Sequence, residues 1–211
     1  MLHRTLDLER TMNPLDKIAG TLITGVVLAL VLVVVLGSPQ GFNFDVVLRW
    51  LHIAAGIAWI GLLYYFNFVQ APGLAEAAAD KGGPGGAGVT KYIAPRALLW
   101  FRWSALVTWV TGAWYLLNKG WLLGAFTLGL AGQAGPFNNA IGIGAWLGTI
   151  MLFNVWVLIW PNQKKILGLT PATDEEKARA RRIAFLASRT NTALSIPMIL
   201  FMAASAHGLP F

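Results

Sequence analysis

The sequence contains no cysteine, and this absence excludes several kinds of chemistry. Without cysteine the chain has no disulfides, no iron–sulfur clusters, no zinc site built on thiolates and no covalently attached c-type haem. Histidine is also scarce, with three in the whole chain. Any metal or haem site in this protein must therefore depend on very few ligands.

Charged residues are scarce as well, at 12% of the 211 residues, while hydrophobic residues make up 56%. A soluble domain carries about a quarter charged residues. The composition therefore predicts an integral membrane protein. The net charge of +7 is explained by basic loops on one side of a membrane and does not require a nucleic-acid partner.

Five hydrophobic stretches are long enough to cross a bilayer as helices, since about 20 apolar residues span its hydrocarbon core. We predict an all-α membrane protein in which an N-terminal arm, 1–17, precedes a transmembrane domain, 18–211. The first span is an anchor facing lipid, too long for a signal-peptide core, in a helix that starts at a cap on Asn13. The other four form a bundle. The predicted spans are 18–36, 45–69, 98–118, 140–160 and 190–207.

The distribution of Lys and Arg predicts the orientation, because cytoplasmic loops carry an excess of these residues. Fourteen of the sixteen cations fall in the arm, in the loops that follow the second and fourth spans, and at the start of the third span. Arg49 and Lys119 are the two on the other side. We therefore expect a multi-pass protein of the bacterial cytoplasmic (inner) membrane, with its N-terminus in the cytoplasm and its C-terminus outside.

Two of the predicted cytoplasmic loops have recognisable patterns. Loop 73–90 contains GGPGGAG, but it lacks the Gly-Lys-Ser/Thr ending of a phosphate-binding loop, and no strand precedes it. Loop 161–189 opens at Pro161 and contains a capping box, with Thr173 as cap and Glu176 three residues later. We expect a basic helix to follow along the cytoplasmic surface, where anionic lipid headgroups would favour it.

His52 is the residue most indicative of function, because an ionisable group inside a span is costly and usually functional. It precedes the small residues Ala54, Ala55 and Gly56, which leave room for a flat group such as haem. His207 is expected at the external end of the last span, on the same side of the membrane as His52. Neutral imidazole suits iron, so His52 and His207 are candidate axial ligands of a haem b. Arg49, one turn before His52, is a candidate partner for a haem propionate.

Simpler interpretations exist for each of these residues. An intramembrane histidine can hydrogen-bond a carbonyl or hydroxyl of a neighbouring helix, and a histidine at the interface needs no special role. Met198 or Met202 is an alternative ligand on the last span. His3, in the cytoplasmic arm, is expected to be solvated.

Ten tryptophans are many for this length. Those near span ends fit an aromatic belt at the interfaces, namely Trp50, Trp100, Trp103, Trp121 and Trp160. Deeper ones either surround a cofactor or pack the core, namely Trp59, Trp109 and Trp146. Arg102 is expected to extend to the cytoplasmic interface. The interiors of the spans hold no carboxylate, which argues against a proton-coupled transporter.

Four stretches, in the same order, resemble the N-terminal membrane domain of the membrane-bound urate oxidase (urate hydroxylase) family. They are RWLHIAAGIAWIG (49–61), KYIAPRALLWFRWSALVTWVTG (91–112), GAWLGTIMLFNVWVLIWPNQKK (144–165) and RTNTALSIPMILFMAASAH (189–207). The resemblance implies a protein of the cytoplasmic membrane. Many members of the family carry an external C-terminal cytochrome c domain, and the predicted external C-terminus agrees with that arrangement.

The chain departs from the family pattern in several places. The family has additional spans between the equivalents of 98–118 and 140–160, and the span 18–36 is an addition. Family histidines have no counterpart near Gly88, Gly142 and Thr190, and Ser104 replaces an acid. His52 and His207 correspond to histidines of the family. The sequence has no counterpart of the cytochrome c domain, and an external cytochrome c would be the natural electron acceptor if that domain is a separate protein.

Two functional hypotheses follow. In the first, the chain is a haem b membrane protein and candidate oxidoreductase that transfers electrons from urate or another small reductant toward an external cytochrome c. In the second, it is a cofactor-free accessory or assembly subunit of a larger respiratory or photosynthetic complex. The retained His52 beside Arg49 favours the first, and the missing histidines favour the second.

Overall fold

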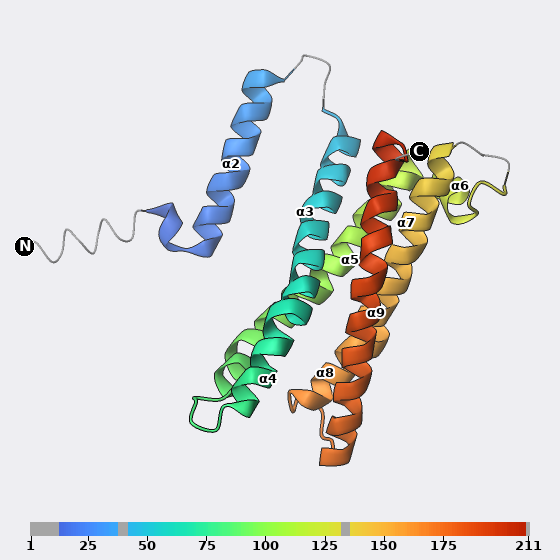
Figure 1. The fold of residues 1–211 in the computed structure, drawn as a ribbon. Coiled ribbons are helices and arrows are strands. Elements are labelled where there is room, and N and C mark those ends of the chain that lie inside the picture. The colour runs from blue at the N-terminus through green and yellow to red at the C-terminus, as the bar shows by residue number, and fades with distance from the viewer. Residues whose placement is uncertain (1–12, 38–41, 132–135, 210–211) are drawn as a thin grey trace, which may run out of the picture. The chain divides into compact units, whose positions relative to one another are not determined.

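The computed structural model describes residues 13–37, 42–131 and 136–209, and every regular element in these ranges is a helix (Figure 1). The chain divides into two units, the N-terminal residues up to Asn43 and the bundle from Phe44 onward. Four helices are long and apolar enough to cross a membrane. The prediction of an all-α, multi-pass membrane protein is confirmed. Residues 1–12 of the predicted arm, including His3, lie outside the described residues.

The first unit contains a short 3-10 turn, Pro14–Asp16, and helix α2, Ile18–Leu36. Asn13 caps the turn, because its side chain accepts a hydrogen bond of 2.9 Å from the Leu15 N–H. The prediction that this cap begins the spanning helix is wrong. The extended backbone of Lys17 (φ −124°) separates the turn from α2. The nineteen residues of α2 are apolar around the whole helix, as a lipid-facing anchor requires.

The second unit is a bundle of long helices joined by short loops (Figure 1). The first helix of the bundle runs without a break from Phe44 to Ala79. The third runs without a break over the candidate membrane span Asn139–Ile166. Shorter pieces with different hydrogen bonding make up these helices. The elements are α3 (Phe44–Tyr64), η2 (Tyr65–Gln70), α4 (Ala71–Ala79), η3 (Val89–Ile93), α5 (Ala94–Asn118), α6 (Leu122–Phe126), α7 (Pro136–Phe153), η4 (Asn154–Ile159), α8 (Trp160–Ile166) and α9 (Asp174–His207).

Helix α5 is not among the four that satisfy both length and apolarity. Its 25 residues make a helix about 37 Å long, enough to cross a membrane. Arg96, Arg102, the tryptophan indole N–H groups and several side-chain hydroxyls make it more polar than the spanning stretches of the other four. It leads from the α4 end of the bundle to the α6 end (Figure 1). Since α3 and α7 both cross in the opposite direction, α5 has to cross with them. The helices predicted at 45–69, 98–118, 140–160 and 190–207 are all present.

The predicted loops are shorter in the structure. The prediction that a loop begins at residue 73 is wrong, because α4 continues to Ala79 through an alanine-rich segment that favours helix. Pro161 does not open a loop, because it is the second residue of α8, which continues to Ile166. The capping box is confirmed, with Thr173 and Glu176 joined by two hydrogen bonds of 2.8 and 3.2 Å. However, the basic segment after it does not form a separate surface helix, since it is the first part of α9 (Figure 1).

Three π-helical segments occur in the described residues, and each ends two residues before a proline: η2 before Pro72, η3 before Pro95 and η4 before Pro161. Proline lacks an N–H, and its ring collides with the carbonyl four residues earlier. A wider turn before the proline moves that carbonyl away and lets the helix continue. This explains why the helices continue past their prolines, including Pro161, where the sequence predicts a loop.

The core lies where α3, α5, η4 and α9 meet. Its largest fully buried side chains are Trp59, Phe101 and Leu63. The buried face of α9 consists mostly of small residues at spacings of three or four, as on one face of a helix. They are Ala180, Ala184, Ala187, Asn191 and Ser195. Small side chains allow the helix backbones to approach closely, which is how helices associate in lipid.

Buried polar side chains connect this face of α9 to its neighbours. Asn154 of η4 donates to the side-chain oxygen of Asn191 (2.8 Å), and Asn191 donates to the Met151 carbonyl (2.9 Å). Tyr64 hydrogen-bonds Ser195 at 2.9 Å. The Ser195 hydroxyl proton goes to the Thr192 carbonyl (2.7 Å), so Tyr64 is the donor in that pair. Asn191 and Ser195 are fully buried.

We expect Asn191→Leu to lower the free energy of unfolding by about 1–2 kcal/mol, because Asn154 loses its acceptor and Met151 its donor. Thermal unfolding in detergent measures this. The double variant Asn154→Leu/Asn191→Leu should recover part of the loss, since it leaves fewer unpaired groups. Thr190→Val, at an exposed position on the same helix, is the control and should change stability by less than about 0.5 kcal/mol. Equal effects of Asn191→Leu and Thr190→Val would contradict the role of this network.

Candidate functional site

His52 lies on α3 and points toward α5, where its Nδ1 is 2.7 Å from the backbone carbonyl oxygen of Thr108. A carbonyl oxygen can only accept a hydrogen bond, so Nδ1 carries the proton. In the neutral imidazole the other nitrogen, Nε2, then keeps its lone pair. Histidines that bind a metal commonly make this arrangement, with one nitrogen donating to a carbonyl and the other coordinating.

Gly112, one turn after Thr108 on α5, makes this position of His52 possible. A Cβ atom at Gly112 would lie 2.7 Å from Nδ1 and 2.8 Å from Cε1 of His52, closer than any real contact. The sequence predicts that Ala54, Ala55 and Gly56, on the same helix as His52, provide the space around it. Gly112 lies on a different predicted span, 60 residues later, so no local pattern connects it with His52.

An ion pair joins α3 and α5 at the end of the bundle nearest His52. The Lys119 ammonium is 2.6 Å from the Asp45 carboxylate, and Asn118 donates to the same carboxylate at 3.2 Å. The hydrogen bond with Asp45 raises the pKa of Lys119 above its ordinary value. Arg49, one turn from Asp45 and one turn from His52, is exposed.

His207 occupies the last turn of α9 and is exposed. The start of α3 and the end of α9 lie at the same end of the bundle (Figure 1), as the sequence predicted for the two histidines. The hydrogen bond of His52 is with α5, not with α9. The alternative ligand Met202 packs against Gly144 of α7, and Met198 is buried in the core.

The three deeper tryptophans have different surroundings. Trp59 is 2% exposed, and its indole N–H has no hydrogen-bond partner among the residues that the structure describes. It lies seven residues, two helical turns, after His52 on the same face of α3. Trp109 donates to Thr149 at 2.8 Å. Trp146 is exposed and donates to the Phe126 carbonyl at 3.0 Å, so it does not line the core.

Two positions where family histidines or acids are absent are filled by packing. At Gly142 a side chain would collide with the Ala125 carbonyl, because α6 lies directly on α7 there. Ser104 is buried, and its hydroxyl donates to the Phe101 carbonyl of its own helix at 3.1 Å. Gly142 therefore has no room for a larger polar side chain.

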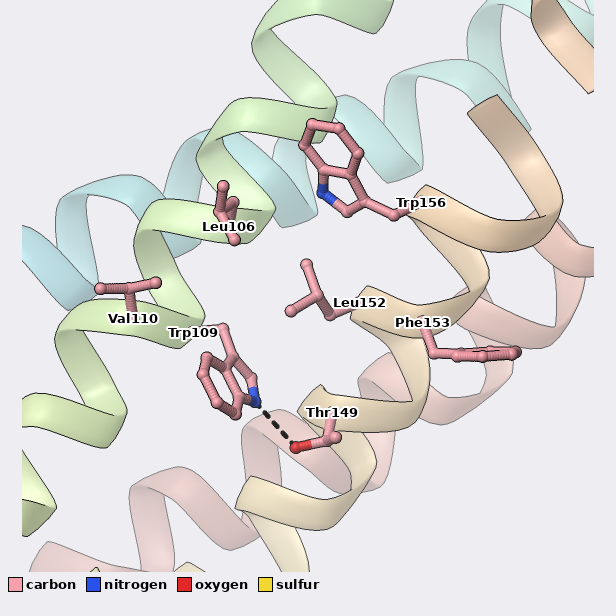
Figure 2. Close-up of a pocket in the computed structure, with 7 residues that line it drawn as sticks. All are labelled: Leu106, Trp109, Val110, Thr149, Leu152, Phe153 and Trp156. Carbon is pink, nitrogen blue, oxygen red and sulfur yellow. Dashed lines mark hydrogen bonds between the residues drawn. The ribbon is translucent and has the colours of Figure 1, made fainter. Parts of the chain in front are cut away.

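A cavity of about 480 Å³ lies between α5 and the α7–η4 helix (Figure 2). A second, of about 250 Å³, lies beside η2, α4 and the glycines that follow Pro84. Neither is lined by His52, Arg49 or His207. Within the described residues no group of three or more His, Asp or Glu side chains could hold a metal ion.

Comparison with known proteins gives one match. The family model described as "Urate oxidase N-terminal" matches residues 42–128 and 130–211. No curated protein and no solved structure matches the chain. The matched region contains every helix of the bundle, from α3 to α9, and leaves out α2. The chain therefore belongs to the urate oxidase N-terminal family, as its motifs predicted.

Proposed function

We propose that this protein is a haem b membrane protein that passes electrons from urate or another small reductant toward an external cytochrome c. In this proposal His52 and His207 would hold the haem iron, and Arg49 would pair with a haem propionate. The supporting observation is the hydrogen bond from His52 Nδ1 to the Thr108 carbonyl. It fixes the tautomer in which Nε2 is available to iron.

The chemistry of the residues present fits a haem. The candidate ligands are neutral imidazoles, which suit haem iron, and the chain offers no thiolate in competition. The unpartnered indole N–H of Trp59, on the His52 face of α3, is a buried donor that a cofactor could satisfy. A bound haem would supply one-electron transfer. The chain's own part is to hold His52 between Thr108 and Gly112, and to keep a cation, Arg49, nearby.

A cofactor-free accessory subunit is the second candidate, and the same observation gives it support. His52 can also serve only as a packing residue between α3 and α5, because it hydrogen-bonds the Thr108 carbonyl and fits closely against Gly112. The packing positions at Gly142 and Ser104, without the family's histidine or acid, also favour this candidate. The two functions differ in what His52 Nε2 does.

We expect the purified protein to show a b-type band in its reduced-minus-oxidised spectrum. His52→Ala should abolish the band, because the iron loses its ligand. His207→Ala should keep haem but change it from six- to five-coordinate, which carbon monoxide binding and the Soret band report. His3→Ala, the third histidine, is the matched control and should leave the spectrum unchanged.

His52→Asn separates haem ligation from packing. Asn keeps a donor for the Thr108 carbonyl but does not ligate haem. The electron-transfer proposal expects no band in this variant and a melting temperature near that of the haem-free parent protein, since bound haem itself stabilises the fold. A colourless parent protein, produced with ample haem, would reject the proposal. In that case His52→Ala should cost about 1 kcal/mol of stability and His52→Asn should restore it, as the accessory-subunit function expects.

We also propose the orientation that the basic loops indicate, with the α4–η3 loop and the start of α9 in the cytoplasm of a bacterial cell and the end of α9 outside. Because the chain has no cysteine, single cysteines report accessibility without background. In spheroplasts, Leu209→Cys should react with a membrane-impermeant maleimide. Lys81→Cys should react only after lysis. The reverse pattern would place the proposed site at the cytoplasmic surface and contradict transfer to an external cytochrome c.

A further inference from the structure

The larger cavity opens along the outer side of α5 and α7 and has an apolar lining. Val110 and Phe153, on its rim, are 43% and 55% exposed. Two of its polar side chains pair with each other, since Trp109 donates to Thr149 across it (Figure 2). The indole N–H of Trp156 has no partner among the described residues, but it is buried and not exposed to the groove. Water would find few partners here, so an apolar occupant is expected. The remaining lining residues are Leu106, Leu152 and Trp156.

The same seam between the helices continues toward the basic end of the bundle. One turn beyond Leu106 on α5 lie Trp103 and Arg102, and one turn beyond Trp156 lies Trp160. Trp103 packs edge-to-face on Trp156, with ring centroids 5.5 Å apart. The Arg102 guanidinium stacks on Trp160, 3.8 Å from the ring centroid. Arg102 is thus held beside the seam, at the basic end of the bundle.

A second cation lies near the same ring. The Lys164 ammonium is 6.0 Å from the centroid of Trp160. The ion pairs of the described residues join Lys119 with Asp45 and Lys177 with Asp174, so no carboxylate in these ranges forms an ion pair with Arg102 or Lys164. Stacking on tryptophan attracts a cation without cancelling its charge. A phosphate matches the donors of a guanidinium well.

We propose that this groove binds one anionic phospholipid from the leaflet on the side of the basic loops. An acyl chain occupies the apolar cavity, and Arg102 and Lys164 hold the headgroup phosphate. The arrangement combines an apolar cavity with two cations at one end of it, along a single seam between spanning helices. Basic pockets between spanning helices on the cytoplasmic side favour anionic lipid headgroups. This proposal does not depend on haem binding.

Native mass spectrometry of the delipidated full-length protein, titrated with phosphatidylglycerol or phosphatidylcholine, tests the proposal. The parent protein should bind one phosphatidylglycerol in preference to phosphatidylcholine. Arg102→Gln/Lys164→Gln should weaken phosphatidylglycerol binding about 25-fold, since each cation contributes about fivefold, and should remove the preference. Arg181→Gln, an exposed cation of α9, is the matched control and should change binding by less than about fivefold.

Val110→Trp fills the cavity from its exposed rim and should weaken the binding of both lipids without unfolding the bundle. Melting temperature and size-exclusion chromatography verify folding. Three results would overturn the proposal: equal binding of the two lipids by the parent protein, unchanged phosphatidylglycerol binding by the Arg102/Lys164 variant, or dissociation of an oligomer by Val110→Trp. The last result would identify the groove as an interface between copies of the chain.

Discussion

The need to satisfy buried backbone groups in lipid shapes the whole bundle. A hydrocarbon environment offers no water to a free carbonyl or N–H, yet Pro72, Pro95 and Pro161 interrupt the regular hydrogen bonding of three helices. The π segments η2, η3 and η4 accommodate these prolines. Carbonyls near two of the segments receive asparagine side chains, as at Leu63 from Asn67 and at Met151 from Asn191. The helices consequently stay long enough to span the membrane.

Close helix packing follows from small residues at the contacts and serves both the fold and the candidate site. The alanine-rich face of α9 brings its backbone near α8 and η4, which puts Asn191 within reach of Asn154. Gly112 likewise lets α5 approach α3 closely. His52 can then donate from Nδ1 to the Thr108 carbonyl, which fixes its tautomer. A single added methyl group at Gly112 would displace the imidazole, so the packing of two helices determines what this histidine can bind.

The two ends of the bundle carry different chemistry. One end holds His52, Arg49, His207 and the Asp45–Lys119 pair, and it is poor in other cations. The other end is rich in Lys and Arg and includes the stacked Arg102. The proposed redox site and the proposed lipid site are therefore separated along the membrane normal. A lipid bound at the basic end would brace α5 against α8 without contacting His52.

The sequence alone determined the membrane class, the positions of the spans, the capping box of α9 and the family, because long apolar runs and local motifs act within one segment of chain. It did not show that the helices continue past Pro72 and Pro161. The π segments before these prolines hydrogen-bond α9 side chains that are 121 and 37 residues away in the sequence. Nor did the sequence reveal Gly112 beside His52, the unpartnered Trp59 or the Arg102–Trp160 stack. Each of these joins residues from different helices, and only the tertiary packing brings them together.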